Sequence, residues 1–420
     1  MSRNSSRSMR RTVVGVAAAA LALVGCGSGA EGGGGTAANG KTELTWFMWA
    51  GSDAEVKAWT TVAGMVNKKH PDITVTFTSL GYPDYWTKIA AQASGGQLPC
   101  LVGMQSLRVP GLGKLMRPLT AEDLSKNGVD INEFDPAIIE GLQLEGKQVA
   151  LPYDLGPYMI FYNKDMFAKA GVPEPKAGWS ADDFISSAKR LTGDGKYGFG
   201  AFPFVDGVQP FATSIFGVQA VDEQGQLKLT DAQYVKAVQW YVDLVQKEKV
   251  APEVPATNDP GWPVNQFLAG NIGMIIDGPW DLINVKTQAK FELGVVQVPT
   301  GPEGKGTVSA GSGFAVAANC ETPDEAVQAL SVITGPEALQ YLGEQGRALP
   351  ARPAQQAAWF ANTVPGAKEA LEAAAETAQP YRSNVKWNQA SQLFQQYGTE
   401  SVNGQQPVQT WLENVQQQAG

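Results

Sequence analysis

Residues 149–162, Val-Ala-Leu-Pro-Tyr-Asp-Leu-Gly-Pro-Tyr-Met-Ile-Phe-Tyr, decide the fold of this chain. Two strand-like runs, Val149–Pro152 and Tyr158–Tyr162, flank the turn-prone residues 154–157, Asp-Leu-Gly-Pro. The roughly 380 residues from Thr42 onward exceed what one hydrophobic core usually serves, so two lobes are expected. We therefore predict that the chain crosses from one lobe to the other at residues 154–157.

Strand-like and helix-like segments alternate on both sides of this crossing. Strands are predicted at Leu44–Trp49, Ile73–Phe77, Cys100–Met104, Ile272–Ile276, Phe291–Val296 and Gly313–Ala317. Helices are predicted from Glu55 through Val66, where apolar residues recur at helical spacing, and at Tyr85–Ala93, Asp324–Ile333, Ala367–Ala378, Ser391–Ser401 and Val408–Gln418. This rhythm indicates an α/β fold in which each lobe has a mostly parallel sheet flanked by helices.

The N-terminus has the features of a bacterial lipoprotein signal. It opens with four basic residues, Arg3, Arg7, Arg10 and Arg11. The apolar run Val13–Val24 is too short to span a bilayer, which needs about 20 residues. Leu23-Val24-Gly25-Cys26 is a lipobox pattern, in which the thiol is acylated and Cys26 becomes the new N-terminus. The Arg10–Arg11 pair matches a twin-arginine signal only loosely, so a plain basic region is favoured.

Residues 27–40 are Gly, Ser, Ala, Thr and Asn with one Glu, a composition that predicts a flexible tether. The ordered part is expected to begin near Thr42. Removal of the signal takes four of the 32 basic residues and none of the 41 acidic ones. The mature protein is therefore strongly acidic, which disfavours nucleic acid and anionic lipid as partners. We expect the protein on the outer face of the cell membrane, held there by lipidated Cys26.

Several segments resemble the bacterial extracellular solute-binding proteins of the ABC-importer family that includes maltose- and other sugar-binding proteins. The matching segments keep the family's order and spacing along nearly the whole mature chain: Leu151–Tyr153, Phe161–Phe167, Ala170–Pro173, Phe267–Met274 with Asp277–Trp280, Gly311–Val316 with Thr322–Ala326, and Asn403–Gly404. Pro99–Cys100 departs from the family, many of whose members carry Pro-Asp there.

The resemblance implies two lobes that close by a hinge on a ligand held between them. The expected parts are a signal at 1–25, a tether at 26–41, an N-terminal lobe of 42–153 plus 308–345, and a C-terminal lobe of 154–307 plus 346–420. Such a protein is a monomer without cofactor or catalytic chemistry, and it hands its ligand to ABC permease subunits. The family's first lobe contains a later strand antiparallel to its third strand, which implies a disulfide between Cys100 and Cys320.

The residues themselves give little support to catalysis. The single His70 stands at a predicted helix end, and with three Cys it cannot form a His/Cys metal cluster. Neither a Gly-x-Ser-x-Gly elbow nor a nucleotide-binding Gly-x-x-x-x-Gly-Lys-Ser/Thr loop is present. A carboxylate pair for glycoside hydrolysis stays open as an alternative, because 41 acidic residues always allow some pair. A surface carbohydrate-binding or sensing module is the other alternative.

The residue types favour a neutral di- or oligosaccharide as ligand. Aromatic faces with polar tips and forked Arg donors suit sugar rings and hydroxyls. Among the 11 Trp, we expect Trp46, Trp59 and Trp240 in the core and Trp86 near the family's cleft. The residues expected to bind ligand are Trp49, Gln105, Arg108, Asp154, Trp262, Asp277, Trp280, Gly311, Ser312, Arg347, Arg382 and Trp387. Some have structural alternatives: a salt bridge for Arg108, a turn cap for Asp154 and a helix N-cap for Asp277.

The lipobox makes a direct prediction. Cys26→Ala removes the thiol that would be acylated, so the variant should be released to the medium or remain unprocessed. Immunoblots of membrane and medium fractions measure this. Equal membrane retention of the variant and the wild type would contradict the lipoprotein interpretation.

Overall fold

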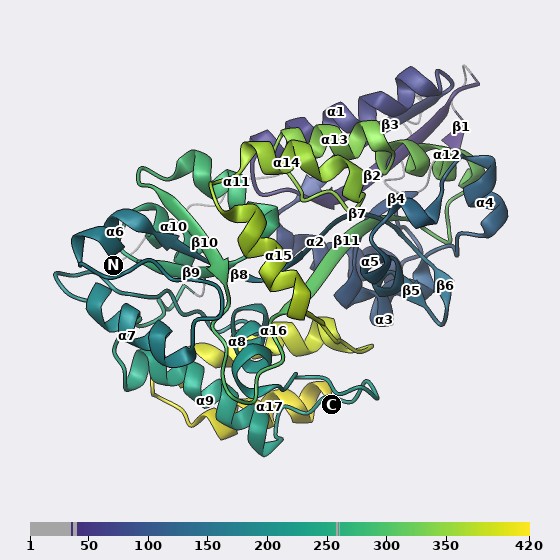
Figure 1. Cartoon of the computed structure of the whole chain (residues 1–420). Coiled ribbons are helices and arrows are strands. Elements are labelled where there is room, and N and C mark those ends of the chain that lie inside the picture. Colours follow the sequence, from purple (N-terminus) through teal and green to yellow (C-terminus); the bar gives the residue numbers. More distant parts are fainter. Residues whose placement is uncertain (1–34, 37–39, 258, 260) are drawn as a thin grey trace, which may run out of the picture. The chain divides into compact units, whose positions relative to one another are not determined.

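The computed structural model describes residues 35–36, 40–257, 259 and 261–420. The predicted signal, the lipobox with Cys26 and most of the predicted tether lie outside these residues. Figure 1 shows the chain as a mixed α/β protein with helices on the faces of its sheets. No helix among the described residues is both long and apolar enough to cross a membrane.

The larger sheet has seven strands in the order β1-β2-β4-β11-β12, with β3 also paired to β2 and β7 to β11. Its strands are β1 (Gly35–Thr36), β2 (Thr42–Trp49), β3 (Ile73–Leu80), β4 (Leu101–Gln105), β7 (Leu151–Pro157), β11 (Val308–Val316) and β12 (Gln379–Pro380). β2 runs parallel to β3 and β4, whereas β11 runs antiparallel to both β4 and β7. We call this sheet with its covering helices the first lobe.

The smaller sheet has three strands in the order β10-β8-β9: β8 (Met159–Asn163), β9 (Met274–Asp277) and β10 (Leu293–Gln297). With its helices it forms the second lobe. β5 (Gln143–Leu144) and β6 (Lys147–Gln148) make a separate hairpin. The α/β class and the two-lobe fold are therefore confirmed.

Strand direction in the second lobe differs from the predicted mostly parallel sheet. β8 pairs antiparallel with both β9 and β10. β8 occupies the middle of this sheet and runs opposite to both neighbours. The parallel neighbour of β9 is the segment around Tyr197, which makes an isolated bridge to Ile272 instead of a full strand.

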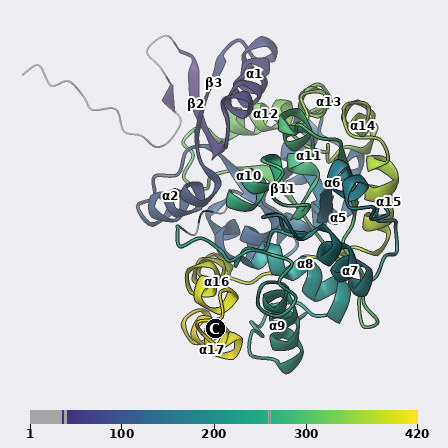
Figure 2. The same ribbon diagram turned by 90° about the vertical axis from the view of Figure 1, so that its left-hand side faces the viewer.

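The helices of the first half of the chain are α1 (Asp53–Lys69), α2 (Tyr82–Ser94), α3 (Val109–Leu112), α4 (Ala121–Lys126), α5 (Pro136–Gly141), α6 (Lys164–Lys169), α7 (Ala181–Leu191) and α8 (Val205–Phe216). Those of the second half are α9 (Ala232–Gln246), α10 (Trp262–Leu268), α11 (Pro279–Gln288), α12 (Pro323–Ile333), α13 (Pro336–Glu344), α14 (Gln356–Asn362), α15 (Ala367–Thr377), α16 (Trp387–Val402) and α17 (Val408–Ala419). Short 3₁₀ turns lie at Ser106–Arg108, Gly113–Leu115, Ile131–Glu133 and Pro353–Gln355. In Figure 2, α16, α17 and α9 gather into one group of helices.

The predicted crossing segment is itself part of a strand. β7 continues through residues 154–157 because β11 pairs with it from Ser309 to Phe314, with an irregularity between Ser312 and Gly313. Two glycines permit the close approach that this requires. A Cβ at Gly311 would lie 2.6 Å from the Asp154 carbonyl oxygen, and one at Gly156 would lie 2.5 Å from the Pro279 ring. The chain then enters β8 two residues after β7 ends.

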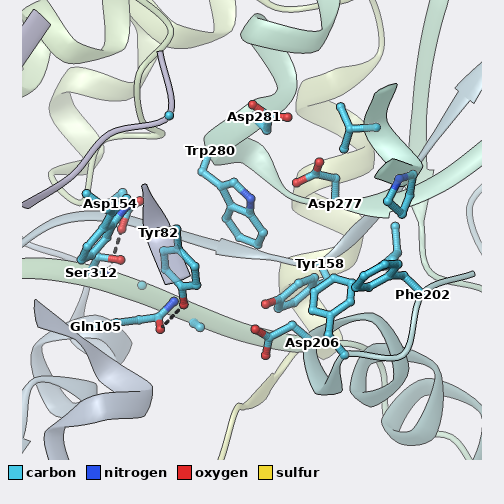
Figure 3. Close-up of a pocket in the computed structure, with 18 of the residues that line it drawn as sticks. Tyr82, Gln105, Asp154, Tyr158, Phe202, Asp206, Asp277, Trp280, Asp281 and Ser312 are labelled. Atoms are coloured by element: carbon cyan, nitrogen blue, oxygen red, sulfur yellow. Dashed lines mark hydrogen bonds between the residues drawn. The ribbon is translucent and has the colours of Figure 1, made fainter. Parts of the chain in front are cut away.

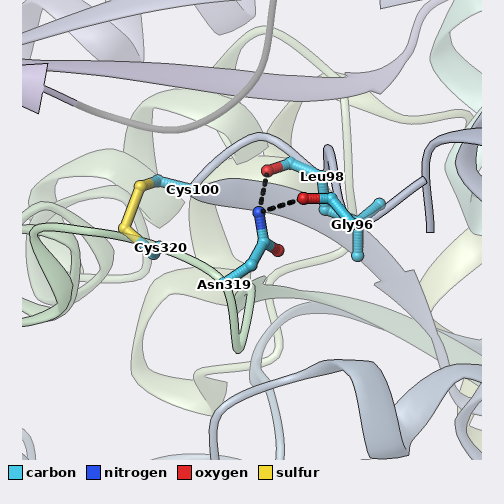
Figure 4. Close-up of a disulfide and its surroundings, with 5 residues drawn as sticks. All are labelled: Gly96, Leu98, Cys100, Asn319 and Cys320. Carbon is cyan, nitrogen blue, oxygen red and sulfur yellow. Dashed lines mark hydrogen bonds between the residues drawn. A yellow bond between two sulfur atoms is a disulfide. The ribbon is translucent and has the colours of Figure 1, made fainter.

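The predicted disulfide is confirmed. β11 pairs antiparallel with β4, placing Val316 opposite Leu101. Cys100 directly precedes β4 and Cys320 follows β11, so the start of one strand meets the end of the other. Their Cα atoms are 4.8 Å apart and their sulfur atoms are bonded (Figure 4). The bond joins positions 220 residues apart in the chain.

Each lobe has its own buried cluster. In the first lobe, Trp46 and Trp59 are almost fully buried and pack with Phe314 from β11. Trp240 is only partly buried against the second lobe's cluster. The expectation of core Trp residues is therefore right for Trp46 and Trp59 and only partly right for Trp240.

Candidate functional site

One cavity of about 340 Å³ is lined by residues of both lobes (Figure 3). This volume is at the lower end of the range of small-molecule sites. The first lobe contributes the ends of β2 and β4 and the middle of β7 and β11, and the second contributes the end of β9 and the start of α11. Ligands in open α/β sheets bind beyond the carboxyl ends of strands, which is where β2, β4 and β9 meet this cavity.

Eight of the twelve residues predicted from sequence line this cavity: Trp49, Gln105, Asp154, Asp277, Trp280, Gly311, Ser312 and Arg347. They come from widely separated parts of the chain. Three lie at strand ends (Trp49, Gln105 and Asp277) and three in the paired middle of β7 and β11 (Asp154, Gly311 and Ser312), while Trp280 lies at the start of α11 and Arg347 follows α13.

Two predicted ligand-binding Trp residues do not line the cavity. Trp387 begins α16 with 2 % of its surface exposed and packs edge-on against Tyr381. Trp262 begins α10 and packs partly buried against the core, while the next two residues, Pro263 and Val264, line the cavity. Both residues were predicted to bind ligand because the family resemblance places them near the cleft. In the structure each stands at the start of its helix, and its indole packs against the protein's own core.

Two predicted Arg residues also lie outside the cavity lining. The Arg108 guanidinium stacks 5.1 Å from the centre of the Trp86 ring and donates to Ser391 on α16, 3.3 Å away. Trp86 is itself 2 % exposed and part of the core. Arg382 donates to the Val221 carbonyl and pairs with Glu223 at 3.8 Å. These side chains join segments of the protein to one another.

The cavity also contains residues that the sequence did not single out: Tyr82, Tyr153, Tyr158, Phe202, Phe204, Asp206, Tyr241, Asp281 and Glu55 among others. Three of them lie next to positions from which other site residues were predicted, so the sequence could have indicated them. Tyr82 comes two residues after β3 ends, Tyr158 lies between β7 and β8, and Asp281 is next to Trp280. Phe202, Phe204 and Asp206 follow the bridge-forming segment near Tyr197, which has no clear strand pattern in the sequence.

Asp154 is fixed in the floor of the cavity by β11. The Ser312 backbone N–H donates to its carboxylate at 2.6 Å, and the Tyr153 and Ser312 side chains also bond to it. Asp154 is only 6 % exposed. Burial raises the pKa of this carboxyl to about 7, although these hydrogen bonds and nearby Arg347 favour the charged form.

Arg347 connects three parts of the protein at the cavity edge. Its guanidinium forms an ion pair with Glu55 of α1 and donates to the Trp280 carbonyl of α11 at 3.3 Å. Glu55 in turn accepts from the Gly51 backbone N–H at 2.8 Å. Both charged side chains are about 15 % exposed, so the pair is shielded without being fully buried.

Asp277 and Asp281 form a bonded carboxyl pair beside the Trp280 ring. The Gly278 backbone N–H and the Trp280 indole also bond to Asp277. Asn284 donates to Asp281 at 2.8 Å. Asp277 was expected to be a candidate helix N-cap, but the cap position of α11 is Gly278. Burial and then mutual repulsion raise the pKa of Asp277 well above its usual value, and burial raises that of Asp281.

Further hydrogen-bonded polar side chains, among them Gln105 and Asp206, lie across the cavity from Asp277 and Asp281 (Figure 3). Tyr82 donates to Gln105 at 2.9 Å, and Tyr381 donates to Asp206 at 2.8 Å. Burial raises the pKa of Asp206 despite the Tyr381 bond. The arrangement offers aromatic faces together with donors and acceptors of hydrogen bonds, which suits a ligand that is polar at its edges and apolar on its faces.

The described residues contain no group of three or more His, Cys, Asp or Glu that could hold a metal ion. A second hollow lies on the second lobe, near Lys169, Lys196 and Lys290. None of the twelve predicted residues lines it.

The fold and the cavity between two lobes define a binding protein of the two-lobe type. A family model described as bacterial extracellular solute-binding protein matches residues 61–380. The chain belongs to this family.

Relatives of known sequence match over part of the chain. A binding protein of Brucella abortus is 27 % identical over 197 residues, 45 % of this chain and 47 % of that protein. A lactose-binding protein of Rhizobium radiobacter is 23 % identical over 249 residues, 59 % of this chain and 58 % of that protein. The chain spans about half the length of the curated relatives that it matches.

The fold has a broader match among solved structures. The substrate-binding protein Lmo0181 of Listeria monocytogenes, solved in complex with cycloalternan, has a TM-score of 0.82 and 22 % identity. The match covers 90 % of this chain and 97 % of that one. The two proteins therefore share the two-lobe fold.

The raised pKa of Asp154 predicts a pH effect. A carboxyl with a raised folded-state pKa favours folding while it is protonated, so its contribution is lost as pH rises from about 4, the unfolded value, to about 7. Relative to Asp154→Asn, the wild type should lose up to about 4 kcal/mol of unfolding free energy over this range. Denaturant unfolding of both proteins at several pH values measures the difference. A difference independent of pH would show that Asp154 has an ordinary pKa.

Proposed function

We propose that the protein is the lipid-anchored substrate-binding component of an ABC sugar importer. It captures a di- or oligosaccharide outside the cell and delivers it to permease subunits in the membrane. It acts as a monomer and carries out no chemistry on the ligand.

The observation that carries this proposal is the setting of Trp280. Its indole lines the cavity beside polar side chains from both lobes, with Asp277 on its own lobe and Asp154 and Ser312 on the other. Sugar rings present C–H faces to aromatic surfaces and hydroxyls to carboxylates and backbone amides. Trp49, Tyr82 and Tyr158 add further aromatic surface around the same space.

The relatives support a saccharide as the ligand class. They include a lactose-binding protein of Rhizobium radiobacter and an arabinooligosaccharide-binding protein of Halalkalibacterium halodurans. The structural neighbour from Listeria monocytogenes was solved with cycloalternan. A ligand larger than a monosaccharide also agrees with the number of aromatic side chains around the cavity.

Delivery requires that the two lobes open and close around the ligand. We propose the division expected from the sequence, 42–153 with 308–345 in one lobe and 154–307 with 346–420 in the other, except that residues 154–157 and β12 pair with β11 and so belong to the first lobe's sheet. The hinge is assigned to the point where β7 leads into β8. The Arg347–Glu55 pair and its bond to the Trp280 carbonyl join α1 to α11 at the cavity edge, so these contacts would change on opening. Retention outside the cell is assigned to acylated Cys26.

The proposal is tested by a thermal-shift screen over saccharides, followed by titration calorimetry with each one that binds. Trp280→Ala should weaken binding by about 1–3 kcal/mol, or roughly ten- to hundredfold, because a large apolar contact surface is lost. Trp240→Ala is the matched control, since Trp240 lies outside the cavity lining and should leave affinity unchanged.

Unchanged affinity of Trp280→Ala would remove Trp280 from the site. A screen in which no saccharide binds would contradict the sugar-importer proposal itself. Release of hydrolysed products from a bound saccharide would favour the glycosidase alternative.

A further inference from the structure

The cavity has an excess of acidic groups. Five carboxyl side chains line it, Glu55, Asp154, Asp206, Asp277 and Asp281, and among the described lining residues Arg347 is the one cationic group. Arg347 already forms an ion pair with Glu55. None of the four aspartates therefore forms a salt bridge with a cationic side chain of the cavity lining.

The acidic groups are closest together at Asp277 and Asp281, whose carboxyl groups bond to each other. Two carboxyl groups can bond to each other only when one of them holds a proton. Their other bonds come from the Gly278 N–H, the Trp280 indole and the Asn284 amide, all uncharged donors. Two charged groups also act on Asp281: Arg347 lowers its pKa and Glu55 raises it. The protein itself thus leaves a shared proton on the pair and no charged donor bonded to it.

A second, independent observation indicates that this space is built for a ligand. The Tyr158 side chain is 7 % exposed and lines the cavity, yet its hydroxyl has no hydrogen-bond partner among the described residues. Because this residue borders the cavity, a ligand there can supply a hydrogen bond to its hydroxyl. Tyr158 also packs edge-on to Trp280, with ring centres 5.0 Å apart, so two aromatic rings border the space next to the aspartates.

We propose that the ligand is a saccharide bearing a protonated amine, whose nitrogen binds between the Asp277 and Asp281 carboxylates while its ring lies against Trp280. This inference rests on the proposed sugar-binding function and changes one property of the ligand that the sequence favoured, its neutrality. An ammonium group donates up to three charge-assisted hydrogen bonds and is attracted to aromatic faces. A hydroxyl group donates one hydrogen bond and carries no charge.

Binding by this route exchanges one cation for another. The protonated amine enters with its own charge, the shared proton leaves the Asp277–Asp281 pair for the buffer, and both carboxylates become anionic and bond to the ammonium group. No bond within the ligand is formed or broken. About one proton per ligand should therefore be released, in contrast to a neutral saccharide, which leaves the pair protonated.

Three disaccharides of one skeleton test this: the β-1,4 disaccharide of glucosamine, its N,N′-diacetyl form, and cellobiose. They carry an ammonium, an acetamide and a hydroxyl group at the same position. In titration calorimetry at mildly acidic pH, the amine form should bind about ten- to hundredfold more tightly than the other two. Repeating the titration in buffers of different ionisation enthalpy should show proton release with the amine form alone.

Asp281→Asn keeps an acceptor for Asn284 but removes a carboxylate, so it should abolish both the preference for the amine and the proton release. Asp277→Asn is the second variant if the first is poorly folded, and circular dichroism checks both. Glu400→Gln, an exposed acid-to-amide change on α16, is the matched control and should keep both effects.

Equal or weaker binding of the amine form, or a preference that survives in both aspartate variants, would overturn the proposal. If cellobiose or another neutral saccharide binds while the amine form does not, the cationic ligand is excluded and the sugar-binding function stands. Failure of every saccharide would contradict the sugar-binding function on which the inference depends.

Discussion

The pairing of β11 on both of its edges is the constraint on which the rest of the structure depends. One edge pairs with β4 of the first lobe, and the other pairs with β7, the strand that leads into the second lobe. The Ser312 backbone N–H at this junction donates to the side-chain carboxylate of Asp154 on β7. The same pairing that connects the lobes therefore holds a buried acid in the floor of the cavity, and it brings Cys100 and Cys320 together at the far end of the strand.

The chemistry of the cavity follows from what each lobe contributes. The first lobe supplies Asp154 and Ser312 on a rigid strand pair, while the second supplies Trp280 and its neighbouring aspartates at the start of α11. Gly156 lets α11 approach β7, because any larger residue would collide with Pro279. A ligand that touches both sets of groups would favour the closed arrangement of the lobes, since only that arrangement makes both contacts.

Much of this arrangement could be predicted from the sequence, and the failures have physical causes. Strand ends and the crossing segment led to Trp49, Gln105 and Asp154, because strand ends in this fold converge on one edge, and the family segment Asp277–Trp280 led to Trp280. Trp387 and Trp262 lie outside the cavity lining, because the position of a residue in a motif does not give the direction of its side chain from the helix. Phe202 and Asp206 were missed because the segment before them relies on a single bridge and lacks strand periodicity. The antiparallel second sheet was missed because spacing along the chain does not encode strand direction.

The central claim is that the cavity between β7, β11 and α11 is where the ligand binds. A crystal structure of the protein with a saccharide that binds in solution tests it most directly. The account predicts a sugar ring against the Trp280 indole, with hydroxyl or amine groups within hydrogen-bond distance of Asp154 or of the Asp277–Asp281 pair. A saccharide bound instead in the hollow near Lys169 and Lys290, with this cavity empty, would contradict it.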